Sequence, residues 1–147
     1  MVWYDVPGSG TPKVSDWQYF NDMGLYIFDC IIVLTDNRIL ESDLAILRAC
    51  ERFRNIEAFI VRSKSDQYIN NMVCEKMPQG FDLRGPDMDA KTRSLERANL
   101  PRKKAYIVCV DAILAAVSNS RSPKAIDEAD LLNDVEEFVW KRLQSGC

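Results

Sequence analysis

The sequence predicts an α/β fold in three layers, in which helices cover both faces of a mostly parallel sheet. Apolar runs of strand length lie at residues 30–34, 57–62 and 105–110, and stretches of helical periodicity lie between and after them. This alternation is typical of parallel sheets, whose strands are buried on both faces and joined by helices. No internal repeat or linker divides the 147 residues, so we expect a single domain over residues 1–147.

The first expected elements lead into the central strand. Residues 2–6 are apolar apart from one aspartate, and we predict a short buried strand there. Residues 7–12 contain two prolines and two glycines and are expected to form a loop. Asp16 suits the start of a helix, and Gly24 suits its end. The run at residues 30–34 is continuously apolar and predicts a central parallel strand.

The later elements follow from the same patterns. Apolar residues recur at helical spacing from Leu40 to Cys50 and predict a helix over residues 41–54. The remaining elements are expected to be strands at residues 57–62 and 105–110, helices at 67–77, 87–98 and 126–143, and loops at 63–66, 78–86 and 119–123.

Composition and charge exclude several classes of function. The formal net charge of −3 gives no basic surface for nucleic acid, so we expect no nucleic-acid partner. The chain has no histidine, which excludes triads and metal sites built on that residue. Its five cysteines form no C-x-x-C pair of the kind that zinc sites use. The longest apolar stretch, residues 112–117, is too short to span a membrane, and no secretory leader is recognisable, so we expect a cytoplasmic protein.

The loop after the first predicted strand has the pattern D-x-x-G, from Asp5 to Gly8. An aspartate at a strand end can hold Mg²⁺, directly or through water. A glycine three residues later lets its backbone N–H approach a γ-phosphate, because no Cβ stands in the way. The same pattern also occurs where an aspartate only caps a turn.

The loop after residues 57–62 has the pattern S-K-x-D, made by Ser63, Lys64 and Asp66. In the guanine-binding pattern N/T-K-x-D, the aspartate accepts hydrogen bonds from N1 and the exocyclic amine of guanine. The aliphatic part of the lysine covers the face of the base. The alternative is a charged turn in solvent. Since this loop and D-x-x-G each follow a predicted strand, in the expected order, together they favour a nucleotide site.

Beyond these two loops, the sequence resembles the immunity-related GTPases, the interferon-inducible class. Four segments carry the resemblance: "WYDVPGSGTP" resembles W-D-x-P-G-x-G-T-P, "DMGLYIFDCIIVLT" resembles M-G-L-x-x-F-D with an apolar run, "RILESD" resembles R-F-x-E-x-D, and "FIVRSKSD" resembles F-V-R-T-K-x-D. The similarity is good over residues 2–66 and then decays. It implies a P-loop NTPase fold of the Ras-like G-domain type.

The resemblance also implies a ligand and its contacts. The family binds guanine nucleotides with Mg²⁺ and hydrolyses GTP to GDP and phosphate, assisted by self-association across the nucleotide face. It also associates with intracellular membranes. Cys109 stands where a small polar residue opens the family's last guanine-contacting loop, although "DAILAAVSNS" after it departs from the pattern. The implied contacts are Asp5 and Gly8 for Mg²⁺ and phosphate, and Ser63, Lys64, Asp66 and Cys109 for guanine.

The phosphate-cradling motif of such GTPases is not found in this sequence. No G-x-x-x-x-G-K-[ST] occurs in it, and in this fold that motif precedes D-x-x-G. We therefore expect an incomplete G domain, from the D-x-x-G strand to the C-terminal helix, with either a shortened sheet of about four strands or poor solubility caused by an exposed strand edge. We expect GTP binding by this chain alone to be weak or absent. Ser9 stands where Ras-type enzymes carry a water-orienting glutamine, so no catalytic residue is assigned.

Two alternatives remain beside a GTPase domain. The first is a degenerate, GTPase-like module that contacts other proteins and binds no nucleotide. The second is a phosphatase in which Asp5 is the nucleophile. The usual haloacid-dehalogenase pattern of such phosphatases requires a second acid two residues after the nucleophile. Pro7 stands there, so we rank this alternative last.

Overall fold

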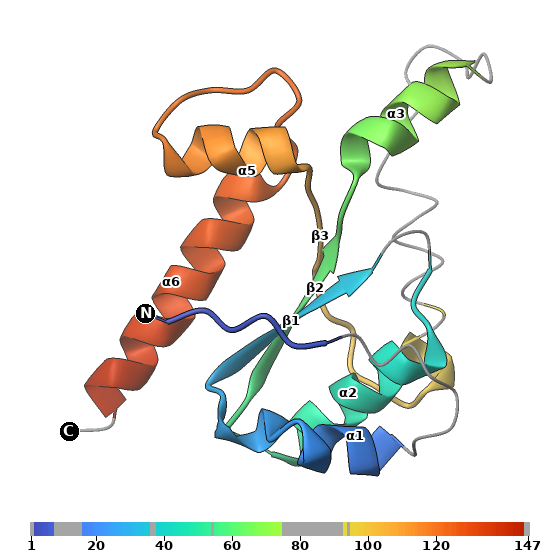
Figure 1. The fold of residues 1–147 in the computed structure, drawn as a ribbon, viewed down its shortest axis with the longest axis vertical. Coiled ribbons are helices and arrows are strands. Elements are labelled where there is room, and N and C mark those ends of the chain that lie inside the picture. The colour runs from blue at the N-terminus through green and yellow to red at the C-terminus, as the bar shows by residue number, and fades with distance from the viewer. Residues whose placement is uncertain are drawn as a thin grey trace.

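The computed structural model describes residues 2–7, 16–35, 38–53, 55–74, 93 and 95–145. Within these residues, three parallel strands form one sheet in the order β1-β2-β3. The strands are β1 (Cys30–Thr35), β2 (Glu57–Arg62) and β3 (Ala105–Ile107). The helices are α1 (Asp16–Asp22), the 3₁₀ helix η1 (Leu25–Ile27), α2 (Glu41–Arg52), α3 (Ser65–Cys74), α5 (Val110–Val117) and α6 (Glu128–Ser145), as Figure 1 shows.

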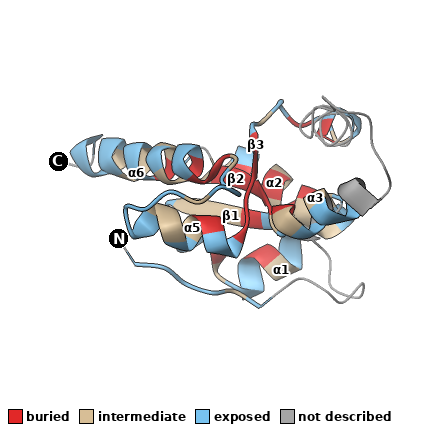
Figure 2. Ribbon diagram, turned by 90° about the horizontal axis from the view of Figure 1, so that it is seen from above, coloured by how far each residue is buried: buried red, intermediate tan, exposed pale blue. Residues whose placement is uncertain are grey.

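Helices cover both faces of this sheet, which confirms the predicted fold class. Alternate residues of β2 enter two separate cores, because successive strand side chains point to opposite faces. Ala58 and Ile60 pack in a core that also contains residues of α1 and α2. Phe59 and Val61 pack in a second core with residues of α6. Figure 2 shows the buried residues gathered along the strands and on the helix sides that face them.

Local signals set the end of α1 and the start of α2. Gly24 adopts a left-handed backbone with φ of 62°, just beyond α1, as predicted for a residue that ends a helix. The aspartate of "RILESD", Asp43, accepts the backbone N–H of Leu40 at 2.8 Å and thereby caps the start of α2. This contact gives Asp43 a structural role.

The predicted strand at residues 2–6 is not formed. Val2, Trp3 and Tyr4 are exposed by 75%, 61% and 68%, and the segment crosses the direction of β1 in Figure 1 instead of following it. A strand requires a partner edge in register, and the described sheet has only β2 beside β1. The segment is held by side chains instead: the Tyr4 ring lies 5.5 Å from that of Phe28. The sheet therefore has three described strands where we expected about four.

The predicted strand at residues 105–110 is also too long. β3 ends at Ile107, and α5 begins at Val110. The pairing stops because β2 ends at Arg62 and the chain beyond it turns into α3. Several predicted elements lie wholly or mostly outside the described residues. They are the loops at 78–86 and 7–12, the end of the predicted helix at 67–77, and most of the predicted helix at 87–98.

Candidate functional site

The S-K-x-D loop follows the carboxyl end of β2, where ligands bind in open parallel sheets. The backbone N–H of Ser63 donates to the carbonyl of Thr35, the last residue of β1, at 3.0 Å. The Ser63 hydroxyl donates to the same oxygen at 3.4 Å. The residue at the first motif position therefore ties the ends of two strands together.

Lys64 adopts a left-handed backbone, with φ of 60°. This conformation is unfavourable for a residue with a Cβ, and it is found where the surrounding structure enforces it, often at functional sites. The Lys64 side chain is exposed. The turn allows α3 to begin at the next residue, Ser65, whose N–H donates to the carbonyl of Val108 at 3.1 Å.

Asp66 lies in the first turn of α3 and is partly exposed. A carboxylate in this position is favourable because of the partial positive charge at a helix N-terminus. The same position is compatible with hydrogen bonds to a ligand at the end of the sheet. The structure thus places Lys64 and Asp66 in one turn, and Ser65 between them connects this turn to the segment after β3.

The segment after β3 brings Cys109 beside this loop. Val108 accepts the Ser65 N–H, and its own N–H donates to the carbonyl of Arg62 at 2.9 Å. Cys109 directly follows and is only 2% exposed, so its thiol is not presented to solvent. Its backbone N–H donates to Glu128 at 2.9 Å. The four residues predicted to contact guanine are therefore brought together by contacts between the two loops.

Lys124 is a further residue of this region, and the sequence analysis missed it. Its Nζ donates to the Asp111 carboxylate at 3.0 Å. This hydrogen bond and the charge of Asp111 are the main causes that raise the pKa of Lys124, and Asp66 contributes to the rise. Lys124 therefore lies within electrostatic range of Asp66. Sequence reasoning could not find it, because it belongs to a segment without a recognised motif.

The predicted phosphate and magnesium residues are not joined to these loops by the described contacts. Asp5 is exposed and follows Tyr4, whose ring lies against Phe28 just before β1 begins. Gly8 lies outside the described residues. Among the residues that the structure describes, no three His, Cys, Asp or Glu residues are grouped to hold a metal ion.

A shallow pocket lies at the other end of the sheet. Its volume is about 340 Å³, and its lining includes Glu57, Lys103 and Tyr106. Lys103 is already paired: its Nζ lies 2.9 Å from a Glu57 carboxylate oxygen and 3.2 Å from one of Glu51. We therefore assign no ligand to this pocket. None of the described helices combines the length and apolar character needed to cross a membrane.

Comparison with known proteins identifies the family. The family model for interferon-inducible GTPase (IIGP) matches residues 1–84, more than half of the chain. The chain belongs to the interferon-inducible GTPase family. Interferon-inducible GTPase 1 of Mus musculus is 32% identical over 82 residues, which are 56% of this chain and 19% of that protein. The chain thus spans about a fifth of the length of that relative.

Family membership confirms the predicted resemblance, and the family match shows that residues 1–84 carry it. Both the D-x-x-G and the S-K-x-D loops lie within the matched residues of the interferon-inducible GTPase family. Cys109, Lys124 and Glu128 lie outside that match, so the hydrogen bond between Cys109 and Glu128 and the charge interaction between Lys124 and Asp66 come from the structure alone.

Proposed function

We propose that the chain carries the guanine-recognising side of a GTPase domain of the interferon-inducible type. The observation that carries the proposal is the S-K-x-D loop, which follows the carboxyl end of the middle described strand and is tied to the segment that begins at Val108. Guanine nucleotide is the ligand that this combination fits best, because the motif offers one carboxylate and one lysine from a single turn.

Each residue has a separate role in the proposed site. Asp66 accepts hydrogen bonds from N1–H and the exocyclic amine of guanine, donors that adenine does not present in that arrangement. The aliphatic part of Lys64 covers one face of the base. Ser63 holds the loop through the carbonyl of Thr35. Cys109 contributes through its place beside the loop, since its thiol is buried.

We assign the phosphate side of the nucleotide to Asp5 and Gly8 on the family pattern alone, because Asp5 follows a segment that packs near the amino end of β1, away from the S-K-x-D loop. Mg²⁺ would be bound through water and the phosphates. We propose weak binding by this chain alone, since the sequence contains no phosphate-cradling G-x-x-x-x-G-K-[ST] loop. No residue is proposed as catalytic. Cytoplasmic location, self-association through the nucleotide face and association with intracellular membranes are further proposals that rest on the family alone.

A second candidate is a protein-interaction module that binds no nucleotide. Three apolar residues of α5 favour it: Val110, Leu114 and Val117 are exposed by 70%, 61% and 68%. Their spacing places them along one face of the helix. Exposed apolar stripes often mark protein contacts.

A titration with nucleotides distinguishes the two candidates. The isotope-labelled chain is titrated with GDP and with ADP into the millimolar range, where weak binding is measurable, and the amide signals of Ser63–Asp66 and Cys109 are followed by NMR. We expect saturable shifts with GDP that are larger than those with ADP. The Asp66→Asn variant should lose this preference.

The matched control is Asp22→Asn, which changes an exposed aspartate at the end of α1, a helix on the other side of the molecule from α3 in Figure 1. It should keep the preference for GDP. An equal response to both nucleotides, or no saturable response, would contradict guanine recognition and support the interaction module.

A further inference from the structure

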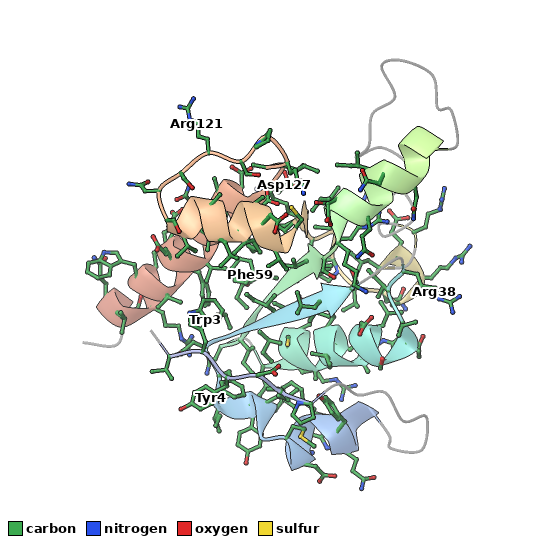
Figure 3. The ribbon with its side chains drawn as sticks, turned by 45° about the horizontal axis from the view of Figure 1, so that its top comes forward. Trp3, Tyr4, Arg38, Phe59, Arg121 and Asp127 are labelled. Carbon is green, nitrogen blue, oxygen red and sulfur yellow. The ribbon has the colours of Figure 1, made fainter. Side chains whose placement is uncertain are left out.

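Glu128, the first residue of α6, is buried, with 1% of its surface exposed. Its Oε1 accepts the N–H of Cys109 at 2.9 Å, and its Oε2 accepts the N–H of Ile126 at 2.6 Å. Burying a carboxylate is strongly unfavourable unless it is hydrogen-bonded, and here backbone donors reach both oxygens. Beside it, Asp127 accepts the N–H of Ile107 at 2.9 Å, and Figure 3 shows Asp127 near the N-terminal end of α5.

These hydrogen bonds continue into the S-K-x-D loop. Cys109, held by Glu128, directly follows Val108. The Val108 carbonyl accepts the N–H of Ser65 at 3.1 Å, and Ser65 directly precedes Asp66. A displacement of Cys109 would therefore be transmitted to the carboxylate that we assign to guanine.

We propose that Glu128 is a positioning residue for guanine recognition. Its carboxylate holds the start of α5 against the start of α6 through the N–H groups of Cys109 and Ile126, and through Val108 and Ser65 it holds the turn that carries Asp66. The proposal rests on the proposed function for the identity of the ligand. Recognition groups work only when neighbouring hydrogen bonds hold them to within a fraction of an ångström of their place.

The chemistry of the glutamate side chain suits this task. Both of its carboxylate oxygens accept hydrogen bonds, and both partners are backbone donors. A glutamine of the same shape can satisfy only one of them, because its amide nitrogen would face an N–H donor. Glu128→Gln thus removes one contact and the charge while it preserves the volume. Glu128→Asp keeps the charge but shortens the side chain by one methylene.

Amide hydrogen exchange without nucleotide tests the positioning step. In Glu128→Gln, we expect the amides of Cys109 or Ile126 to exchange about tenfold faster or more, since hydrogen bonds to charged groups are the stronger class. We also expect the Ser65 and Asp66 amide signals to shift. The control is Glu136→Gln, which changes an exposed glutamate of the same helix and should alter none of these signals.

Nucleotide selectivity tests the link to recognition. The ratio of GDP affinity to ADP affinity should fall on the order of tenfold in Glu128→Gln, since a hydrogen bond from guanine to a carboxylate contributes at least about that factor to an affinity. A purely structural role would lower both affinities equally. An unchanged ratio, or unshifted Ser65 and Asp66 signals, would overturn the proposal.

Two further outcomes of these experiments concern the folding of the variant and the nucleotide preference of the unmodified chain. If Glu128→Gln does not fold, the same two criteria are applied to Glu128→Asp. If the unmodified chain does not prefer GDP over ADP, the proposed function fails. The exchange measurements then decide whether Glu128 positions the loop, independently of the ligand.

Discussion

The left-handed backbone of Lys64 predicts that glycine is more stable than alanine at this position. With φ of 60°, any residue that carries a Cβ is strained here, whereas glycine adopts this conformation readily. Lys64→Ala and Lys64→Gly both remove the exposed side chain and its interactions. They differ only in the Cβ, so comparing the two variants isolates the backbone strain.

The expected difference follows from two opposing terms. The left-handed conformation costs about 1–2 kcal/mol for a residue with a Cβ. Glycine loses more conformational entropy on folding than alanine, which offsets about 0.5–1 kcal/mol of that advantage. We therefore expect Lys64→Gly to have the higher free energy of unfolding, by about 0.8 kcal/mol when the middle of each range is taken. At an ordinary helical position the sign is reversed, and glycine is less stable by about 1 kcal/mol.

Urea unfolding followed by circular dichroism measures this difference. The matched control pair is Lys141→Ala and Lys141→Gly, at an exposed position within α6, where glycine should be the less stable variant. At a typical dependence of about 1–3 kcal/mol per molar urea, the expected midpoints of the Lys64 pair differ by a few tenths of a molar. If Lys64→Ala proves as stable as Lys64→Gly, the strain inferred from φ is wrong. Both Lys64 variants should lose guanine preference to a similar extent, because both lack the aliphatic chain.

Two remaining predictions concern ionisable side chains. The hydroxyl of Tyr106 donates to the Asp134 carboxylate at 2.6 Å, and this contact is the main cause that lowers the pKa of Asp134. Asp134→Asn should thus lose about 1 kcal/mol of stability or less at neutral pH. The deficit should begin to shrink when urea unfolding is repeated below about pH 4, where the unfolded chain binds the proton, and it should disappear only below the lowered pKa of the folded state. Burial raises the pKa of Cys50 to about 12, whereas Cys30 is only partly buried. Peptide mapping after brief alkylation should find Cys30 modified before Cys50, and the reverse order would contradict the burial that the structure gives Cys50.

β1, β2 and the position of the motif loop were predictable because local sequence determines them. Residues 57–62 form a strand with the predicted bounds, and residues 30–35 exceed the prediction by one residue. A continuous apolar run fits a strand that is buried on both faces and fits little else of that length. Once β2 is placed, Lys64 and Asp66 must follow its carboxyl end, since only Ser63 separates Lys64 from it.

The errors arose where structure depends on distant residues. The segment at 2–6 has the composition of a strand, but it crosses the direction of β1 (Figure 1), and pairing requires two segments that run alongside each other in register, which composition does not specify. Residues 105–110 form one apolar run, but only Ala105–Ile107 pair with β2, and the chain enters α5 at Val110. Glu128 stands nineteen positions after Cys109, so nothing in local sequence indicates that its carboxylate meets that amide.

The contacts that hold the S-K-x-D loop are made mostly by backbone atoms. Ser63 binds the Thr35 carbonyl, and the Ser65 N–H binds Val108. None of these contacts uses the Asp66 carboxylate, whose structural contribution is its place in the first turn of α3, worth about 0.3–1 kcal/mol for an exposed acid. Asp66 and the strained Lys64 are therefore the features of this turn on which the proposed recognition of guanine rests, and the nucleotide titration of Asp66→Asn decides between that role and a structural one.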